Sequence, residues 1–537
     1  MTVHQGLLAS IAKRQHIRLR HVQAKSRWLS SSVRVEKDSL FQYTSGRWLW
    51  NEREHLEARQ RWFSVPNLQQ VACRATGAET CILVEKIGEG NYNKAYRLEM
   101  DNGQKIIAKV PHPNAGPPVL TTSSEVATME FVRSVLNIPV PRVLAWSATD
   151  KNPVQAEYII MEEARGSQLH KVWQDLPLRT KADVVSEFVE IEKRLLSVSF
   201  DRLGSLYFKD SGIAGCEPAV VREGVSDCVD HIEATYCIGP ITRREFWEKE
   251  RKEMHHHGPW TSCVDYLDSI AQREIDWINR YAKPHEQDNM TWQYVHPEQN
   301  SSKAHTHLLQ KFRSAVPYIV PRDPQLVSPR LWHPDFHAGA WTAPAIIGAN
   351  PPLVLDYGVD MLMKLPENFK SLDDATKDEL RYQVSQSILI HKYEATTAEK
   401  NPLMHKVIRH PHGQTLKQLE AFAGSTWDNC LYPFQDCLIN VEREWDHFGN
   451  DEPCPYQFSR EELRRHDDEA DVFNKSQEFW QGLRGVLTDE GYTSKEMYGQ
   501  AVETVKHLRD AGLSAMEGED RRVFEEETLW VESLEKI

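Results

Sequence analysis

The feature that most constrains the fold of this chain is a set of three apolar segments between residues 81 and 110. Residues 81–90 and 94–100 are joined by the short turn 91–93, and Asp101-Asn102-Gly103 comes before the third segment, residues 105–110. Segments of this length that are separated by Gly and Asn are typical of strands in successive hairpins. The sequence therefore predicts an antiparallel three-stranded meander.

The meander carries groups that suit a phosphate ligand. Gly88 and Gly90 have no side chains, so the backbone there and at Asn91 could approach phosphate oxygens closely. Lys109 lies on the third strand, where its ammonium group could reach the phosphates of a nucleotide. Two nearby glycines also mark ordinary turns, but a glycine loop, a hairpin and a strand lysine in this order are more specific. We expect a nucleotide-binding lobe.

The segment after the meander is predicted to be a helix that Thr121–Ser124 can cap, with its apolar face at Val126, Met129, Val132 and Leu136. Glu125 is expected in its first turn, where its carboxylate could pair with Lys109 and hold the lysine toward phosphate. The alternative is that Glu125 only complements the helix dipole. Residues 158–163 are predicted to form a strand that leads into a second lobe. The backbone from Met161 to Glu163 is expected to hold an adenine edge.

The stretch His333-Pro-Asp335-Phe-His337-Ala-Gly339 has neither helical nor strand periodicity. One interpretation is a plain turn, since Pro, Asp and Gly are turn formers; the other is a loop that carries chemistry. Phosphoryl transfer needs an aspartate that orients the attacking hydroxyl group and accepts its proton, and Asp335 suits this role. Asp356, at the end of a strand predicted for residues 352–358, suits the binding of Mg²⁺.

Composition excludes several classes of protein. No apolar run is long enough to span a membrane, and the net charge of −14 argues against a general nucleic-acid binder. The 9 cysteines form no C-x-x-C pair, which indicates reduced thiols rather than a zinc site or a disulfide framework. Residues 255–257 are three consecutive histidines, which cannot all face one ion, so we expect a solvated loop there.

The first 35 residues have the composition of a mitochondrial transit peptide. They contain seven Lys and Arg residues and no Asp or Glu, with interleaved apolar residues and a serine run. The alternative is a disordered basic tail. A mitochondrial location is therefore expected. At the other end of the chain, residues 375–537 are predicted to be helical, with aromatic stripes in the core.

Several stretches together resemble the fungal aminoglycoside phosphotransferase (phosphotransferase enzyme) family, of the altered inheritance of mitochondria protein 9 type. The resemblance runs from about residue 41 to the C-terminus and rests on FQYTSGRWLWNE, IGEGNYNKAYRL, IIAKVPHP, SSEVATMEFVR, YIIMEEARG, GPWTSCVDYLDSIAQRE, LWHPDFHAG, KLPENF and QEFWQGLR.

The resemblance implies an α+β, bilobal, protein-kinase-like fold. A small antiparallel-sheet lobe is expected over residues 36–165 and a large, mainly helical lobe over 166–537. It also implies ATP and Mg²⁺ as cofactors, with Lys109 as the phosphate lysine and Glu125 as its partner. Asp335 would be the catalytic aspartate and Asp356 the second metal aspartate. The acceptor would be a small hydroxylated molecule that the sequence does not identify.

Two departures from the family pattern H-x-D-x-H-x-G-N bear on activity. The chain reads HPDFHAGA, so Ala340 stands where a magnesium-binding Asn is expected, and a methyl group cannot coordinate a cation. The KLPENF stretch also follows Asp356 almost at once. A catalytically impaired pseudokinase that acts as a mitochondrial binding or regulatory protein is therefore the alternative function. The sequence predicts no oligomeric state.

Overall fold

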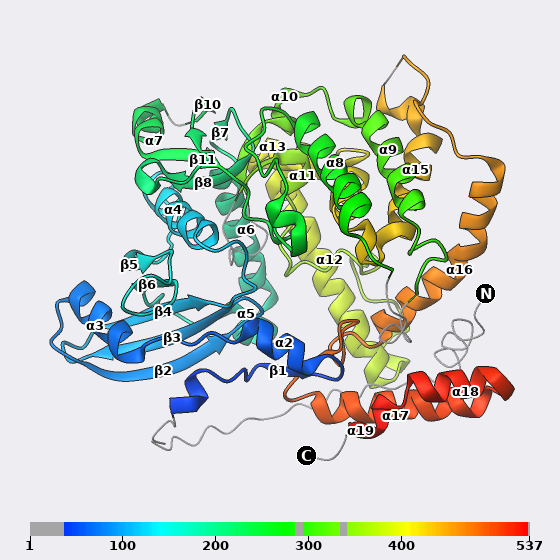
Figure 1. Cartoon of the computed structure of the whole chain (residues 1–537), viewed down its shortest axis with the longest axis horizontal. Coiled ribbons are helices and arrows are strands. Elements are labelled where there is room, and N and C mark those ends of the chain that lie inside the picture. Colours follow the sequence, from blue (N-terminus) through cyan, green and yellow to red (C-terminus); the bar gives the residue numbers. More distant parts are fainter. Residues whose placement is uncertain (1–36, 225, 285–293, 333–340, 450, 535–537) are drawn as a thin grey trace.

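The computed structural model describes residues 37–534 except 225, 285–293, 333–340 and 450. The described chain forms a small lobe built on an antiparallel sheet and a large lobe that is mainly helical (Figure 1). The predicted α+β fold with these two lobes is confirmed. The predicted transit peptide and the stretch with Asp335 lie outside the described residues.

The small lobe contains a five-stranded antiparallel sheet in the order β2-β3-β4-β6-β5. Its first three strands are the predicted meander, and β3 alternates between half-buried and buried residues because one face packs on the core. The turn between β3 and β4 places Gly103 at φ 80°, a conformation that favours glycine. The strands are β2 (Cys81–Glu89), β3 (Asn93–Met100), β4 (Lys105–Pro111), β5 (Val143–Ser147) and β6 (Tyr158–Glu162), and α3 (Val65–Thr76) packs on them.

Helix α4 (Leu120–Ser134) connects the two lobes. It packs against β5 of the small lobe, while buried Ala127, Phe131 and Val132 belong to the core of the large lobe. Its start differs from the prediction, because the helix begins before the expected cap and residues 121–124 are buried inside it. Glu125 therefore lies in the second turn, where complementing the helix dipole is no longer its main role.

A distant residue supplies the missing cap of α4. The Glu157 carboxylate, just before β6, accepts hydrogen bonds from the Thr122 hydroxyl at 2.6 Å and the Val119 N–H at 3.5 Å. Burial raises the pKa of Glu157. The position of α4 is thus fixed by a contact that local sequence patterns do not reveal.

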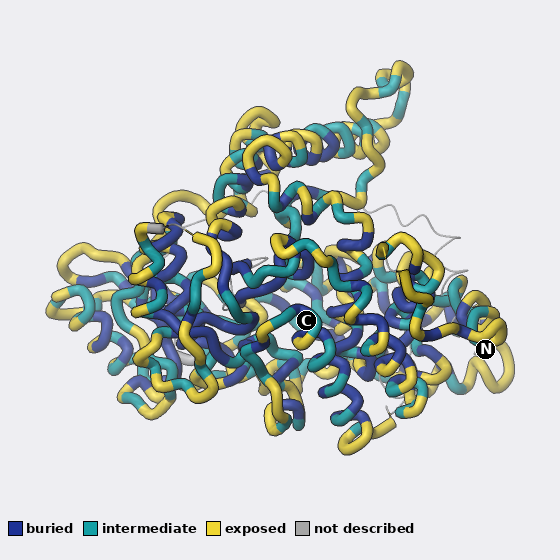
Figure 2. The backbone as a smooth tube through the Cα atoms, turned by 90° about the horizontal axis from the view of Figure 1, so that it is seen from above, coloured by how far each residue is buried: buried dark blue, intermediate teal, exposed yellow. Residues whose placement is uncertain are grey.

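The large lobe contains a seven-stranded sheet in the order β10-β7-β12-β13-β8-β11-β9. The buried residues concentrate in the interior of the molecule, with exposed residues on the outer turns (Figure 2). The strands are β7 (Ser199–Phe200), β8 (Gly204–Phe208), β9 (Glu217–Pro218), β10 (Val221–Glu223), β11 (Tyr236–Gly239), β12 (Pro329–Trp332) and β13 (Trp341–Pro344).

The large lobe is mainly helical, and residues 255–257 lie outside its helices and strands, as expected of a loop. The principal helices are α5 (Leu169–Val172), α6 (Leu178–Leu195), α7 (Val229–Thr235), α8 (Cys263–Tyr281), α9 (Ser302–Ile319), α10 (Pro324–Val327), α11 (Ala345–Gly348), α12 (Asp374–Lys400), α13 (Pro402–Ile408), α14 (Gly413–Ala423), α15 (Leu431–Arg443) and α16 (Arg460–Gly482).

The strand predicted for residues 352–358 was wrong. The segment consists of turns, packed between α6 and α12 through buried Leu355. Pro351 precedes it and Pro352 is its first residue, and neither carries a backbone N–H group that could donate to a ladder. Asp356 therefore does not end a strand.

The two ends of the described chain meet in a third packing unit. Strand β1 (Gly46–Trp48) pairs with β14 (Tyr492–Ser494), and Leu49 is buried among the C-terminal helices. Those helices are α17 (Tyr498–Ala515), α18 (Gly518–Glu527) and α19 (Trp530–Ser533), while α2 (Glu52–Arg59) follows β1. Residues 46–49, which were expected to belong to the small lobe, thus also pack in the C-terminal unit.

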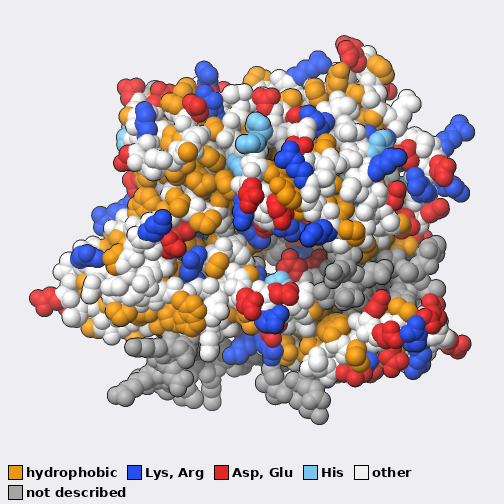
Figure 3. Space-filling model, in the orientation of Figure 1, with side chains coloured by type: hydrophobic (Ala, Val, Ile, Leu, Met, Phe, Trp, Pro, Cys, Tyr) orange, Lys and Arg blue, Asp and Glu red, His pale blue; other side chains and the backbone are white. Residues whose placement is uncertain are grey.

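Acidic and basic side chains are interspersed on the face shown in Figure 3. In the described ranges, no helix has the length and apolar composition needed to cross a membrane.

Candidate nucleotide-binding site

Lys109 and Glu125 form an ion pair between the two lobes. Lys109 projects from β4, and its Nζ atom contacts Oε1 of Glu125 on α4. Both side chains are largely buried, with exposed fractions of 13% and 15%. Solvent screens most of the attraction between exposed charges. This largely buried pair is therefore stronger than an exposed pair would be. The structure therefore holds the lysine at a fixed position beside the small-lobe sheet.

The glycine-rich turn of the β2–β3 hairpin has free space along its backbone. A Cβ atom built on Gly88 or Gly90 would have no other atom within 4 Å. The Gly90 N–H donates to the Asn93 carbonyl at 2.9 Å, which closes the turn, and Asn91 is exposed at its tip. This open backbone is compatible with the close approach of an anionic ligand.

Glu89, between the two glycines, is a buried charge that the sequence reasoning missed. Its carboxylate lies 3.0 Å from Lys94 Nζ and 3.1 Å from Lys86 Nζ, and the Thr44 N–H donates to it at 2.9 Å. The Ser45 hydroxyl donates to the Glu89 carbonyl at 2.6 Å. Burial lowers the pKa of Lys94 despite the adjacent carboxylate. These contacts hold the β2–β3 hairpin against residues 44 and 45.

Tyr92 connects the hairpin tip to the large lobe, and this contact was also missed. The Arg244 guanidinium donates to the Tyr92 hydroxyl, and its central carbon lies 4.5 Å from the centre of the ring. Arg244 opens a short 3₁₀ turn of the large lobe, Arg244–Phe246. The sequence shows the Tyr beside Gly90 but offers no signal for a partner so far along the chain.

Met161 and Glu163 lie in different parts of the segment that leads from the small lobe to the large lobe. Met161 lies inside β6, paired with Ile107 of β4 and Val143 of β5, whereas Glu163 follows the last strand residue. The Arg97 guanidinium of β3 donates to Glu163 Oε1 at 2.5 and 2.9 Å. Glu163 thus links the start of the segment between the lobes to strand β3 of the meander.

Asp356 lies in a turn with its carboxylate already bonded. The Gly358 N–H donates to Oδ1 at 3.0 Å and the Tyr382 hydroxyl to Oδ2 at 3.0 Å. In the part of the chain that the structure describes, no three His, Cys, Asp or Glu residues group as a metal site would require. Asp335 and Ala340 are outside that part.

Comparison with known proteins gives relatives over most of the chain. A subtelomeric hrmA-associated cluster protein of Aspergillus fumigatus is 28% identical over 492 residues, which cover 80% of this chain and 92% of the relative. Altered inheritance of mitochondria protein 9, mitochondrial, is 22% identical in Candida albicans and 23% in Saccharomyces cerevisiae. The Candida match covers 82% of this chain and 82% of the relative. The Saccharomyces match covers 80% of this chain and 83% of the relative. No family model matches.

The chain resembles altered inheritance of mitochondria protein 9, as predicted. The names of these Candida and Saccharomyces relatives also confirm the expected mitochondrial location. Among solved structures, aminoglycoside phosphotransferase APH(4)-Ia matches with 12% identity and a TM-score of 0.29, over 68% of this chain and 98% of that chain. A GDP and kanamycin complex of APH(2")-IIIa matches with 10% identity and a TM-score of 0.30, over 70% and 99%.

Proposed function

We propose that this protein is a mitochondrial phosphotransferase that binds ATP between its lobes and transfers the terminal phosphate to a small hydroxylated acceptor. The observation that carries the proposal is the Lys109–Glu125 ion pair beside an open glycine-rich hairpin. A strand lysine held by a helix glutamate is the arrangement that positions nucleotide phosphates in kinase-like enzymes.

Each residue has a definite role in this proposal. The Lys109 ammonium would neutralise phosphate oxygens, and Glu125 would hold the ammonium in place. Backbone N–H groups from Gly88 to Asn91 would approach the same phosphates, while the Tyr92–Arg244 contact keeps the hairpin over the large lobe. Glu163, at the crossing, is the best placed residue for a backbone contact with the base.

Asp335 would accept the proton of the acceptor hydroxyl as that oxygen attacks the terminal phosphorus. The bond from phosphorus to the bridging oxygen would break, and ADP would leave with that electron pair. Mg²⁺, when bound, would neutralise charge on the phosphates. Asp356 would be a ligand of this ion, since the Tyr382 and Gly358 hydrogen bonds leave further lone pairs on its carboxylate oxygens.

The second candidate function is a pseudokinase that binds nucleotide without turnover. Two observations favour it: Ala340 stands where an Asn ligand is expected, and Asp356 lies in a turn rather than at the end of a strand. Under this proposal the ion pair and the hairpin would still hold a nucleotide, and the protein would act through a binding partner.

Thermal shift and ADP release separate the two functions. We expect ATP with MgCl₂ to stabilise the wild type and Asp335→Asn, but not Lys109→Ala. If the protein is an enzyme, ADP release requires Asp335. Stabilisation that is independent of Mg²⁺, with ADP release no greater than in Asp335→Asn, would support the pseudokinase. Equal stabilisation of Lys109→Ala would contradict both functions.

A further inference from the structure

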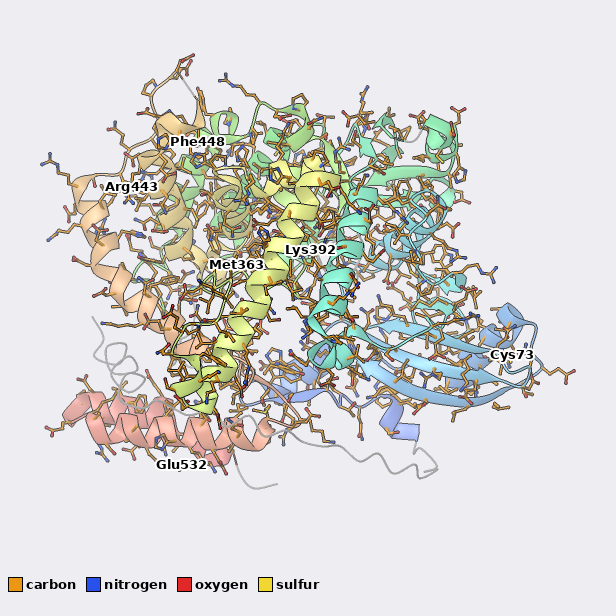
Figure 4. The ribbon with its side chains drawn as sticks, turned by 180° about the vertical axis from the view of Figure 1, so that it is seen from behind. Cys73, Met363, Lys392, Arg443, Phe448 and Glu532 are labelled. Atoms are coloured by element: carbon orange, nitrogen blue, oxygen red, sulfur yellow. The ribbon has the colours of Figure 1, made fainter. Side chains whose placement is uncertain are left out.

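A large cavity lies in the large lobe, away from the strand that carries Lys109. It has a volume of about 1070 Å³ and is enclosed by the 350–357 turns, by α13 and by the start of α14. This volume is at the upper end of the range for small-molecule sites. Leu362 N–H donates to Ser387 of α12 at 2.8 Å, and Figure 4 shows the segment with Met363 beside that helix, which also carries Lys392. The turns that wall the cavity are therefore held in place by α12.

Lys417 provides a cation in this cavity that has no acidic partner among the described residues. Its Nζ atom donates to the Ala349 carbonyl and, at 2.9 Å, to Asn350 Oδ1. Burial lowers the pKa of Lys417 to about 8, and no carboxylate offsets that effect. Lys417 is half-buried and two acceptors already hold its ammonium, so an anion in the cavity would complete the coordination by accepting the third N–H.

The two carboxylates of the cavity already have partners of their own. Asp356 accepts hydrogen bonds from Tyr382 and Gly358, and Glu394 pairs with Arg409 at 2.5 Å. The donors to Asp356 are neutral, so this carboxylate keeps its charge. The three cations that line the cavity, Lys417, Arg409 and exposed Arg484, nevertheless outnumber its two carboxylates by one.

The start of α14 adds a second feature that favours an anion. Gly413 and Gln414 line the cavity at the first turn of this 11-residue helix, and Lys417 lies on its next turn. His412 makes no capping hydrogen bond, but His410 satisfies the first two N–H groups, since its ring Nδ1 accepts from the His412 N–H at 3.3 Å and its carbonyl oxygen from the Gly413 N–H at 3.1 Å. An anion would therefore bind at the N–H groups that follow these two. The first N–H groups of a helix, together with its dipole, form a recurrent phosphate-binding arrangement.

We propose that this cavity binds a phosphate-bearing small molecule, with the phosphate held by Lys417 and the start of α14. The cavity is larger than a phosphate group needs, so the remainder of the ligand is an organic body that would contact the wall formed by Val407 and Ile408. The inference does not depend on the proposed nucleotide site, because none of its residues belongs to the small lobe or to α4.

Thermal shift of the full chain with sodium phosphate and with phenyl phosphate, against sodium chloride of equal ionic strength, tests this site. We expect saturating phosphate to raise the Tm of the wild type by about 2 °C or more, and phenyl phosphate to act at lower concentration. Lys417→Met should lose both effects while its own Tm without ligand is unchanged or higher, since the substitution removes a buried charge. Lys392→Met, which removes an exposed lysine of α12, should respond like the wild type.

Lys109→Ala serves as the control for phosphate binding at the nucleotide site. It should keep the part of the phosphate-induced shift that Lys417→Met loses, whatever the outcome for ATP. The proposal is overturned if phosphate stabilises the wild type no more than chloride does, or if Lys417→Met retains the full shift. It is also overturned if the shift disappears in Lys109→Ala and persists in Lys417→Met.

Discussion

At the residue scale, the chain contains buried ionisable groups whose titration couples to folding. Glu192 of α6 is buried against α12, where the Tyr393 hydroxyl donates to its carboxylate at 2.9 Å. Burial raises the pKa of Glu192 to about 8, from an ordinary value of 4.5. Between these pH values the folded state binds more protons than the unfolded state, so stability falls as pH rises through this window.

Glu192→Gln should remove that dependence, since an amide oxygen can still accept from Tyr393 and does not ionise. We expect the variant to match the wild type near pH 5 and to exceed its free energy of unfolding near pH 9 by on the order of 3 kcal/mol. Urea denaturation at both pH values measures the difference. Glu187→Gln, an exposed position on the same helix, is the control. A wild type whose stability does not fall across this range would contradict this coupling.

At the scale of elements, the position of α4 decides where Glu125 lies. The sequence predicted this helix from its apolar period, and the β2–β4 meander from its turn residues, because both patterns are local. It misplaced the start of α4, because the cap is Glu157, which comes after β5 in the chain and directly before β6. It also predicted a strand at Asp356 from apolar content alone, although the two preceding prolines exclude a ladder there.

Loss of the remote cap should destabilise α4. Glu157→Ala leaves the Thr122 hydroxyl and the Val119 N–H without this acceptor, so we expect a loss of about 1–2 kcal/mol in the free energy of unfolding. Because α4 carries Glu125, the ATP-induced thermal shift should fall as well. Asp150→Ala, at an exposed position of the same lobe, should change neither. A Glu157→Ala variant with unchanged denaturation and an unchanged ATP response would argue against this role.

At the scale of the whole molecule, the two ends of the chain are joined to the candidate site. Strand β1 pairs with β14, and Thr44 and Ser45, directly before it, hold Glu89 of the glycine-rich hairpin. The C-terminal helices therefore connect through one short segment to the hairpin. No local sequence pattern could have predicted this pairing, because its two strands come from opposite ends of the chain.

Gly46→Ala should disrupt this connection. A Cβ atom on Gly46 would lie 2.3 Å from the Thr493 carbonyl oxygen, so β1 and β14 would have to separate. Hydrogen–deuterium exchange should then become faster in α17–α19 and in residues 85–95. Gly499→Ala introduces the same methyl group where no atom lies within 4 Å and should leave exchange unchanged. Exchange in residues 85–95 that is equal in both variants would show that the hairpin does not depend on this pairing.

The proposed function depends above all on Lys109, which would hold the phosphates of a nucleotide. Calorimetric titration of ATP into the full chain tests this role. Lys109→Met should weaken ATP binding by about tenfold or more, since it removes the ammonium–phosphate attraction. Lys105→Met, on the same strand but half exposed and paired with Glu99, should bind ATP as the wild type does. Equal ATP affinity in all three proteins, or no ATP binding by the wild type, would contradict the claim.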